Sequence, residues 1–181
     1  MFSQYWVGNV PGSTITAAQS VVLQGLGNVT ATADEINNKF DGSKSYVALV
    51  SATYGAAYSI LAADTGKTLL VPNSTANVTF SLPAEVAGLN YKIVYIGGAE
   101  DAEDWVITSG ANANAFIGGL EHQDLDGDTI ETVYSNGTTN AKLTLDKPGA
   151  GTEINLLCNG TKWYIWGRSV SATVPAFAVF A

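Results

Sequence analysis

The chain has 181 residues, one histidine, one cysteine and a formal net charge of −8. Proton exchange and nucleophilic attack usually depend on histidine, cysteine or clustered carboxylates, so this composition favours a structural or binding protein over an enzyme. No cofactor is expected. The acidic charge argues against nucleic acid and anionic membrane surfaces as partners, because their phosphates repel it. No apolar run approaches the roughly 20 residues that a membrane helix requires.

Residues 1–44 are predicted to form an extended arm. They contain only four charged side chains before position 44, and each large apolar side chain left in water would cost about 1.5–3 kcal/mol. Residues 32–40 predict one short helix, because Thr32 can cap it and Glu35 follows three residues later. The arm is therefore expected to lie against other polypeptides through Phe2, Tyr5, Trp6, Val21, Leu23, Ile36 and Phe40.

Residues 45–169 show short β segments separated by turn residues, which is typical of a sandwich or a barrel. The fold class that we predict is all-β, as an antiparallel sandwich or a jelly-roll-like barrel, since the two share these signals. The expected strands cover residues 58–61, 68–71, 77–82, 91–96, 105–108, 131–134, 141–145, 154–158 and 162–166.

Two Asn-Gly pairs predict turns in the second half of this domain. Asn136-Gly137 and Asn159-Gly160 each stand between two expected strands, and Asn-Gly accepts the positive φ angles of a type I′ hairpin turn. In the strand after Asn159-Gly160, alternation places Trp163 and Ile165 on one face and Tyr164 and Trp166 on the other.

Residues 170–181 are predicted to form a second extended segment, a C-terminal tail. The tail carries no charged residue. Like the arm, it is expected to lie on a protein surface, with Phe177 and Phe180 as contact residues.

Two motifs near residue 64 resemble catalytic or nucleotide-binding signatures. Asp64-Thr65-Gly66 resembles the triplet of aspartic proteases, which need two such carboxylates; this chain has one, so a homodimer would be required. Gly66-Lys67-Thr68 resembles the end of a phosphate loop, but that loop needs glycine where Leu61 stands. A turn is the favoured interpretation of both.

Asp124, Asp126 and Asp128 form the one cation site that we consider, since calcium prefers carboxylate oxygens. Their order around Gly127 does not match an EF-hand, and a solvated acidic loop is the favoured interpretation. His122 has no second histidine beside it and is expected to be a polar surface residue. Cys158 follows an apolar run and is expected to be a small core residue.

Carbohydrate binding is an alternative raised by Trp163, Tyr164 and Trp166. Sugar sites often use flat aromatic faces, and these three aromatics lie within four consecutive residues. One face of their strand is expected to be core, which leaves the other face for a sugar or for a subunit contact.

Several segments resemble virion proteins of tailed bacteriophages. Residues 28–37 are similar to a Thr-Ala-x-x-Glu-Ile/Leu-Asn segment common in such proteins. Residues 60–68, 78–83 and 87–92 resemble β domains of phage head decoration (cement) proteins and of some fibre proteins. The resemblance covers about residues 28–170 and transfers no catalytic residues.

The resemblance implies a protein of the capsid exterior, made in the host cytoplasm. A decoration protein bridges neighbouring capsid subunits, so the implied partners are the major capsid protein and copies of the chain itself, as a homotrimer. The alternative is a tail fibre or a receptor- or glycan-binding module of the phage tail.

Overall fold

The computed structural model describes residues 46–49 and 55–180. The chain divides into two units, Met1–Lys44 and Ser45–Ala181, and the architecture below is that of the second. The predicted arm, its helix at residues 32–40 and its contact residues from Phe2 to Phe40 lie outside the described residues.

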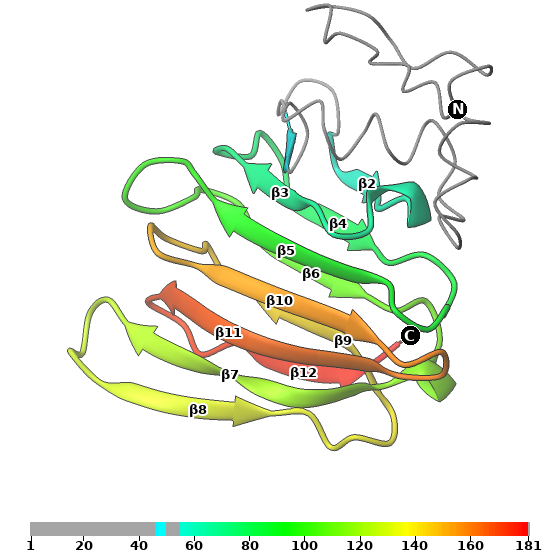
Figure 1. The fold of residues 1–181 in the computed structure, drawn as a ribbon. Helices are drawn as coiled ribbons and strands as arrows, with labels where there is room; N and C mark the ends of the chain where they lie inside the picture. Colours follow the sequence, from blue (N-terminus) through cyan, green and yellow to red (C-terminus); the bar gives the residue numbers. More distant parts are fainter. Residues whose placement is uncertain (1–45, 50–54, 181) are drawn as a thin grey trace, which may run out of the picture. The chain divides into compact units, whose positions relative to one another are not determined.

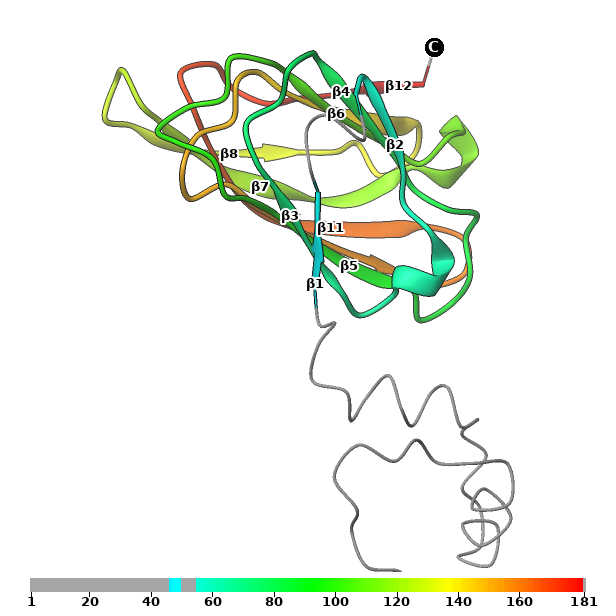
Figure 2. The ribbon, with the colours of Figure 1, turned by 90° about the horizontal axis from the view of Figure 1, so that it is seen from above.

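The described residues form a β-sandwich of two sheets (Figures 1 and 2). The larger sheet has seven strands, in the order β1 (Tyr46–Ala48), β3 (Thr68–Val71), β5 (Asn90–Tyr95), β10 (Glu153–Cys158), β11 (Trp163–Ser171), β7 (Phe116–Asp124) and β8 (Ile130–Tyr134). The smaller sheet has five, in the order β12 (Ala176–Val179), β9 (Asn140–Leu145), β6 (Trp105–Thr108), β4 (Val78–Ser81) and β2 (Ala57–Ser59). Short 3-10 turns, η1 (Ala62–Asp64) and η2 (Asn112–Asn114), join strands of the sandwich.

The path of the chain explains why both sheets are mixed. From β1 to β6 the chain alternates between the sheets, so β1, β3 and β5 pair in parallel in one sheet, and β2, β4 and β6 do so in the other. Later strands add antiparallel pairs, such as β10 with β11. The predicted all-β sandwich is confirmed, with mixed rather than wholly antiparallel pairing.

The core fills the space between the sheets and follows from the alternation of each strand. The pattern buries every second residue, as in β9, where Ala141, Leu143 and Leu145 are buried and their neighbours are not. Aromatic rings cross the core: Trp105 contacts Phe80 at 5.5 Å and Tyr95 at 5.7 Å between ring centroids, both edge to face. Cys158 lies buried in this core, as expected.

The two Asn-Gly pairs have different outcomes. β10 and β11 do form the predicted hairpin, but Cys158 pairs with Trp163, so the loop has four residues instead of a two-residue type I′ turn. The side chain of Asn159 organises it, since Oδ1 accepts bonds from the backbone N–H groups of Thr161 and Lys162. Around Asn136 the predicted hairpin is wrong, because β8 belongs to the larger sheet and β9 to the smaller one.

The C-terminal tail is a further correction. β11 extends to Ser171, and β12 pairs with β9 as an edge strand of the smaller sheet. Phe177 packs on Phe116, with 6.3 Å between ring centroids, and so contributes to this domain's own core. Phe180 is exposed, and its backbone N–H donates to Oδ1 of Asn112.

Among the helices of the described residues, none has the length and apolar character needed to cross a bilayer.

Candidate functional site

The Asp64 motif is a structural turn. Asp64 is the last residue of η1, and Nζ of Lys67 lies 2.8 Å from Oδ1 of Asp64. The hydroxyl of Tyr91 donates to the carbonyl oxygen of Leu61 at 3.1 Å, which fastens the same turn to β5. Burial, followed by the nearby charge of Asp64, raises the pKa of Tyr91 to about 12. Asp64 is thus committed to holding its own turn.

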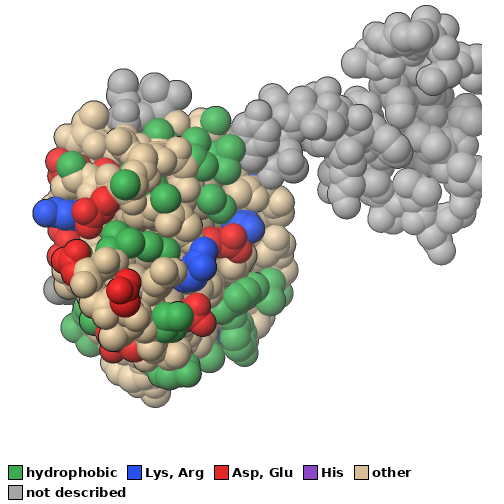
Figure 3. All heavy atoms as spheres, turned by 90° about the vertical axis from the view of Figure 1, so that its left-hand side faces the viewer, with side chains coloured by type: hydrophobic (Ala, Val, Ile, Leu, Met, Phe, Trp, Pro, Cys, Tyr) green, Lys and Arg blue, Asp and Glu red, His purple; other side chains and the backbone are tan. Residues whose placement is uncertain are grey.

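The acidic loop lies between β7 and β8 and is ordered by its first aspartate. Oδ1 of Asp124 accepts a bond from the backbone N–H of Asp126 at 2.9 Å, which is a local turn motif. Within residues 46–49 and 55–180, no three His, Cys, Asp or Glu side chains converge as metal ligands would. Figure 3, which views the left-hand side of Figure 1, shows acidic side chains spread over that face of the domain in separate patches. The described geometry of the loop therefore gives no support to a cation site at Asp124, Asp126 and Asp128.

His122 is not the surface residue that the sequence predicts. It lies on β7, points between the sheets and is 1% exposed. Its Nε2 lies 3.0 Å from the carbonyl oxygen of Ser171, and its Nδ1 lies 3.5 Å from Oε1 of Glu131 on the neighbouring strand. Nε2 of the ring therefore links β7 to β11, whereas Nδ1 is buried and makes no hydrogen bond with any described residue.

Asp101 is a buried carboxylate that the sequence did not single out. It is buried and accepts bonds from the backbone N–H of Ser74, at 3.0 and 3.1 Å, and from Nε1 of Trp105, at 3.2 Å. These bonds tie the β3–β4 and β5–β6 connections together. No local sequence signal separates Asp101 from the acidic residues around it.

The outer face of the larger sheet is the candidate binding surface. As predicted, Trp163 and Ile165 point into the core, where both are buried, while Tyr164 is 37% and Trp166 50% exposed. A half-exposed tryptophan on a regular sheet offers a flat apolar face to a partner. The outward residues around it define what that partner can be.

Strand register places Trp166 in a row across six strands. Asn155 pairs with Trp166 on one side and with Lys92 on the other, and Lys92 pairs with Thr68. Beyond β11, the register of β7 puts Gly119 beside Trp166, and Gly119 pairs with Tyr134 of β8. We call this set the Trp166 row; its members are Thr68, Lys92, Asn155, Trp166, Gly119 and Tyr134.

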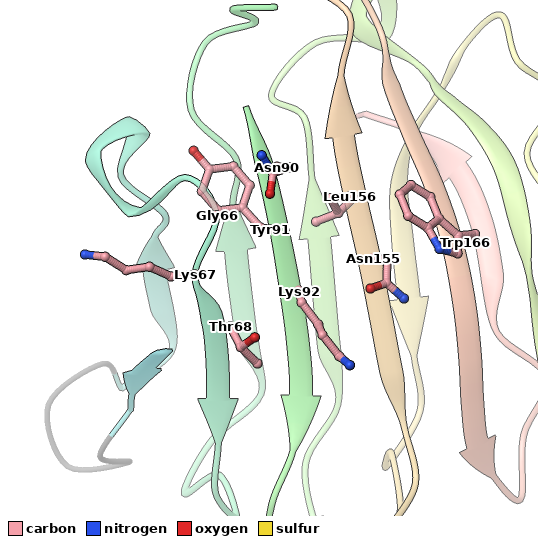
Figure 4. Close-up of a pocket in the computed structure, with 9 residues that line it drawn as sticks. All are labelled: Gly66, Lys67, Thr68, Asn90, Tyr91, Lys92, Asn155, Leu156 and Trp166. Atoms are coloured by element: carbon pink, nitrogen blue, oxygen red, sulfur yellow. The ribbon is translucent and has the colours of Figure 1, made fainter. Parts of the chain in front are cut away.

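A shallow pocket of about 260 Å³ lies along one half of this row. Its lining includes Thr68, Lys92, Asn155 and Trp166, whose side chains lie next to one another on adjacent strands (Figure 4). Leu156 and Tyr91 are also among the residues that line the pocket.

Glu153 fixes the polar side chains of the pocket. Nζ of Lys92 lies 2.9 Å from its Oε2, and Nδ2 of Asn155 donates to its Oε1 at 3.2 Å. The hydrogen bond from Lys92, followed by that from Asn155, lowers the pKa of Glu153 despite its partial burial. Lys92 and Asn155 are thereby held in place on the sheet.

The sequence indicated Trp166 through its alternation with Trp163, but it did not indicate the rest of the row. Only the pairing of strands far apart in the chain brings together Lys92, Gly119, Tyr134 and Asn155.

Comparisons of the sequence with known proteins found nothing similar: it matches no protein-family model and no curated protein.

Proposed function

We propose that the chain is a non-enzymatic structural protein of a tailed-bacteriophage virion, which decorates the capsid by bridging neighbouring subunits through its N-terminal arm. One observation carries the proposal. Residues 45–181 form one unit, and the two sheets of that unit, which include the C-terminal strand β12, enclose its core. The partners are the major capsid protein and copies of the chain, as a homotrimer on the capsid exterior.

The attachment segment is residues 1–44. Because Phe177 packs within the sandwich, the C-terminal end is already used in the fold. Residues 1–44 combine four charged side chains before position 44 with many large apolar ones, a composition that favours contact with other polypeptides.

The titratable side chains of the sandwich also support a structural role. Asp64 holds its own turn through Lys67, whereas Asp101 binds a neighbouring connection and His122 a neighbouring strand. Each of the three therefore has a role in the fold that requires no chemistry on a substrate.

Deletion of residues 1–44 tests the proposal. Capsids of the phage that encodes the chain, prepared without it, should bind the full chain on cosedimentation and should lose the truncated one. Circular dichroism should show that the truncated protein keeps its β structure, and full-length Trp166→Ala should still bind capsids. Capsid binding by the truncated protein equal to that of the full chain would overturn the role of the arm.

A tail location is the second candidate, because the exposed row around Trp166 suits a surface that meets a host. Labelled protein located by electron microscopy on purified virions separates the two: density over the capsid shell supports decoration, and density on the tail supports a fibre or receptor-binding module. Light scattering of the purified chain tests the homotrimer.

A further inference from the structure

We propose that the Trp166 row binds an uncharged oligosaccharide laid across the strands of the larger sheet. The proposal goes beyond decoration and does not depend on where the protein sits on the virion. It rests on the aromatic faces, the fixed polar groups and the charge balance of the row.

Two aromatic side chains provide the stacking surfaces. Trp166 is half exposed, and Tyr134, two strands away, is 70% exposed. Gly119 stands between them, and a Cβ added there would lie 2.8 Å from Cδ1 of Tyr134 and 2.2 Å from the carbonyl oxygen of Val133. The edge of the Tyr134 ring therefore lies close to Gly119, which stands next to Trp166 in the row.

The polar groups lie on the other side of Trp166. Asn155 and Lys92 follow it in the row, with Thr68 beyond them (Figure 4). Their amide, ammonium and hydroxyl groups donate and accept hydrogen bonds, as sugar hydroxyls do. Because Glu153 already holds Lys92 and Asn155, little side-chain freedom is lost when a ligand binds them.

The charges of this face favour an uncharged ligand. Lys92 is paired with Glu153 at 2.9 Å. Arg168 stands in register between Glu153 and Glu121. Since each cation faces a carboxylate, and the whole chain is acidic, no surplus positive charge is left for an acidic saccharide.

The length of the row favours a chain of sugars over a monosaccharide. The row crosses six strands, and five spacings of about 4.8 Å give about 24 Å from Thr68 to Tyr134. A pocket on one half and a second aromatic ring on the other provide contacts along that whole distance.

The test is binding of the full-length chain to arrayed cello-, chito-, malto- and manno-oligosaccharides, with hyaluronan fragments as the acidic comparison. We expect at least one neutral series to bind, with affinity that rises with chain length, and the fragments of hyaluronan not to bind. In a fluorescence titration of a full-length Trp6→Phe variant with the neutral oligosaccharide that binds best, emission should change because Trp166 is exposed, whereas Trp105 and Trp163 are buried.

Three variants locate the site. Trp166→Ala should weaken binding of that oligosaccharide about tenfold or more, and Tyr134→Ala should weaken it less and mainly for the longer members of the series. Phe180→Ala, which removes an exposed aromatic outside the row, should leave the affinity unchanged.

Three results would overturn the proposal: no binding to any neutral series, binding to hyaluronan fragments alone, or unchanged affinity in Trp166→Ala. None of these would affect the decoration proposal, because that one is tested by the binding of the chain to capsids. Loss of capsid binding on deletion of residues 1–44, with oligosaccharide binding retained, would separate the two functions.

Discussion

The inner and outer faces of β11 show how one strand serves two purposes. Trp163 is fully buried and lies 5.9 Å from Tyr91 between ring centroids, whereas Trp166, three residues later, is half exposed beside the pocket. Alternation alone separates the two side chains. The side chains of the inner face therefore contribute mainly to stability, whereas those of the outer face remain accessible to a partner.

This difference predicts that substitutions on the two faces have separable effects. A buried side chain contributes through packing, so its loss leaves a cavity. An exposed side chain that touches few neighbours contributes little to folding but can contribute strongly to a contact. The four predictions below run from the largest expected effect on stability to the smallest.

Trp163→Ala should lower the free energy of unfolding by about 3–5 kcal/mol, because it empties a large volume in the core beside Tyr91. Urea denaturation followed by circular dichroism measures the change. Trp163→Phe, which keeps an aromatic ring, should lose clearly less. A loss below about 1 kcal/mol for the alanine variant would mean that Trp163 does not pack as described.

Asp101→Ala should lower the free energy of unfolding by about 2–4 kcal/mol, since removing a buried acceptor costs about 1–3 kcal/mol for each donor that it leaves without one. The closest donors are the backbone N–H of Ser74 and Nε1 of Trp105, and the backbone N–H of Glu103 donates at 3.4 Å. Glu103→Ala, which removes a neighbouring carboxylate, is the control and should change stability by less than about 0.5 kcal/mol. Equal losses in the two variants would contradict the role given to Asp101.

The sequence predicted most strands of the sandwich, because period-2 alternation is a local signal. β3 and β6 match the expected ranges 68–71 and 105–108. β7 was missed: its Gly118-Gly119 pair resembles a loop, but a Cβ at Gly118 would lie 2.2 Å from the carbonyl oxygen of Ile165. These glycines let neighbouring strands approach closely, which is a tertiary requirement that no local pattern shows.

Pairing between strands was beyond local signals. The parallel pairs arise because the chain crosses from sheet to sheet between β1 and β6, and a parallel pair has no turn motif to mark it. For the same reason the sequence indicated Trp166 but not Asn155, Lys92 or Tyr134. His122 was misplaced, and Asp101 was not singled out, because polar residues are buried wherever the fold supplies partners, and those partners come from distant parts of the chain.

Glu153 tests the electrostatics of the outer face. Its folded-state pKa lies below the ordinary value of 4.5, so the carboxylate stabilises the fold above that pH, and the stabilisation is lost as the pH falls through the lower, folded-state pKa. Because the side chain is 41% exposed, we expect less than about 0.5 kcal/mol. Denaturation of wild type and Glu153→Gln should differ at pH 6 and converge in acid; a constant difference would contradict this assignment.

Trp166→Ala should change the free energy of unfolding by less than about 0.5 kcal/mol, as little as Glu153→Gln, because half of the side chain is already in water. The same urea denaturation that measures Trp163→Ala measures it. A loss comparable to that of Trp163→Ala would show that Trp166 supports the sheet, and weakened oligosaccharide binding in the variant could then be an effect of unfolding. If the variant loses less stability than this limit and still binds the oligosaccharide more weakly, the fold that presents the row is unchanged. The weaker binding would then mean that the exposed ring contacts the ligand.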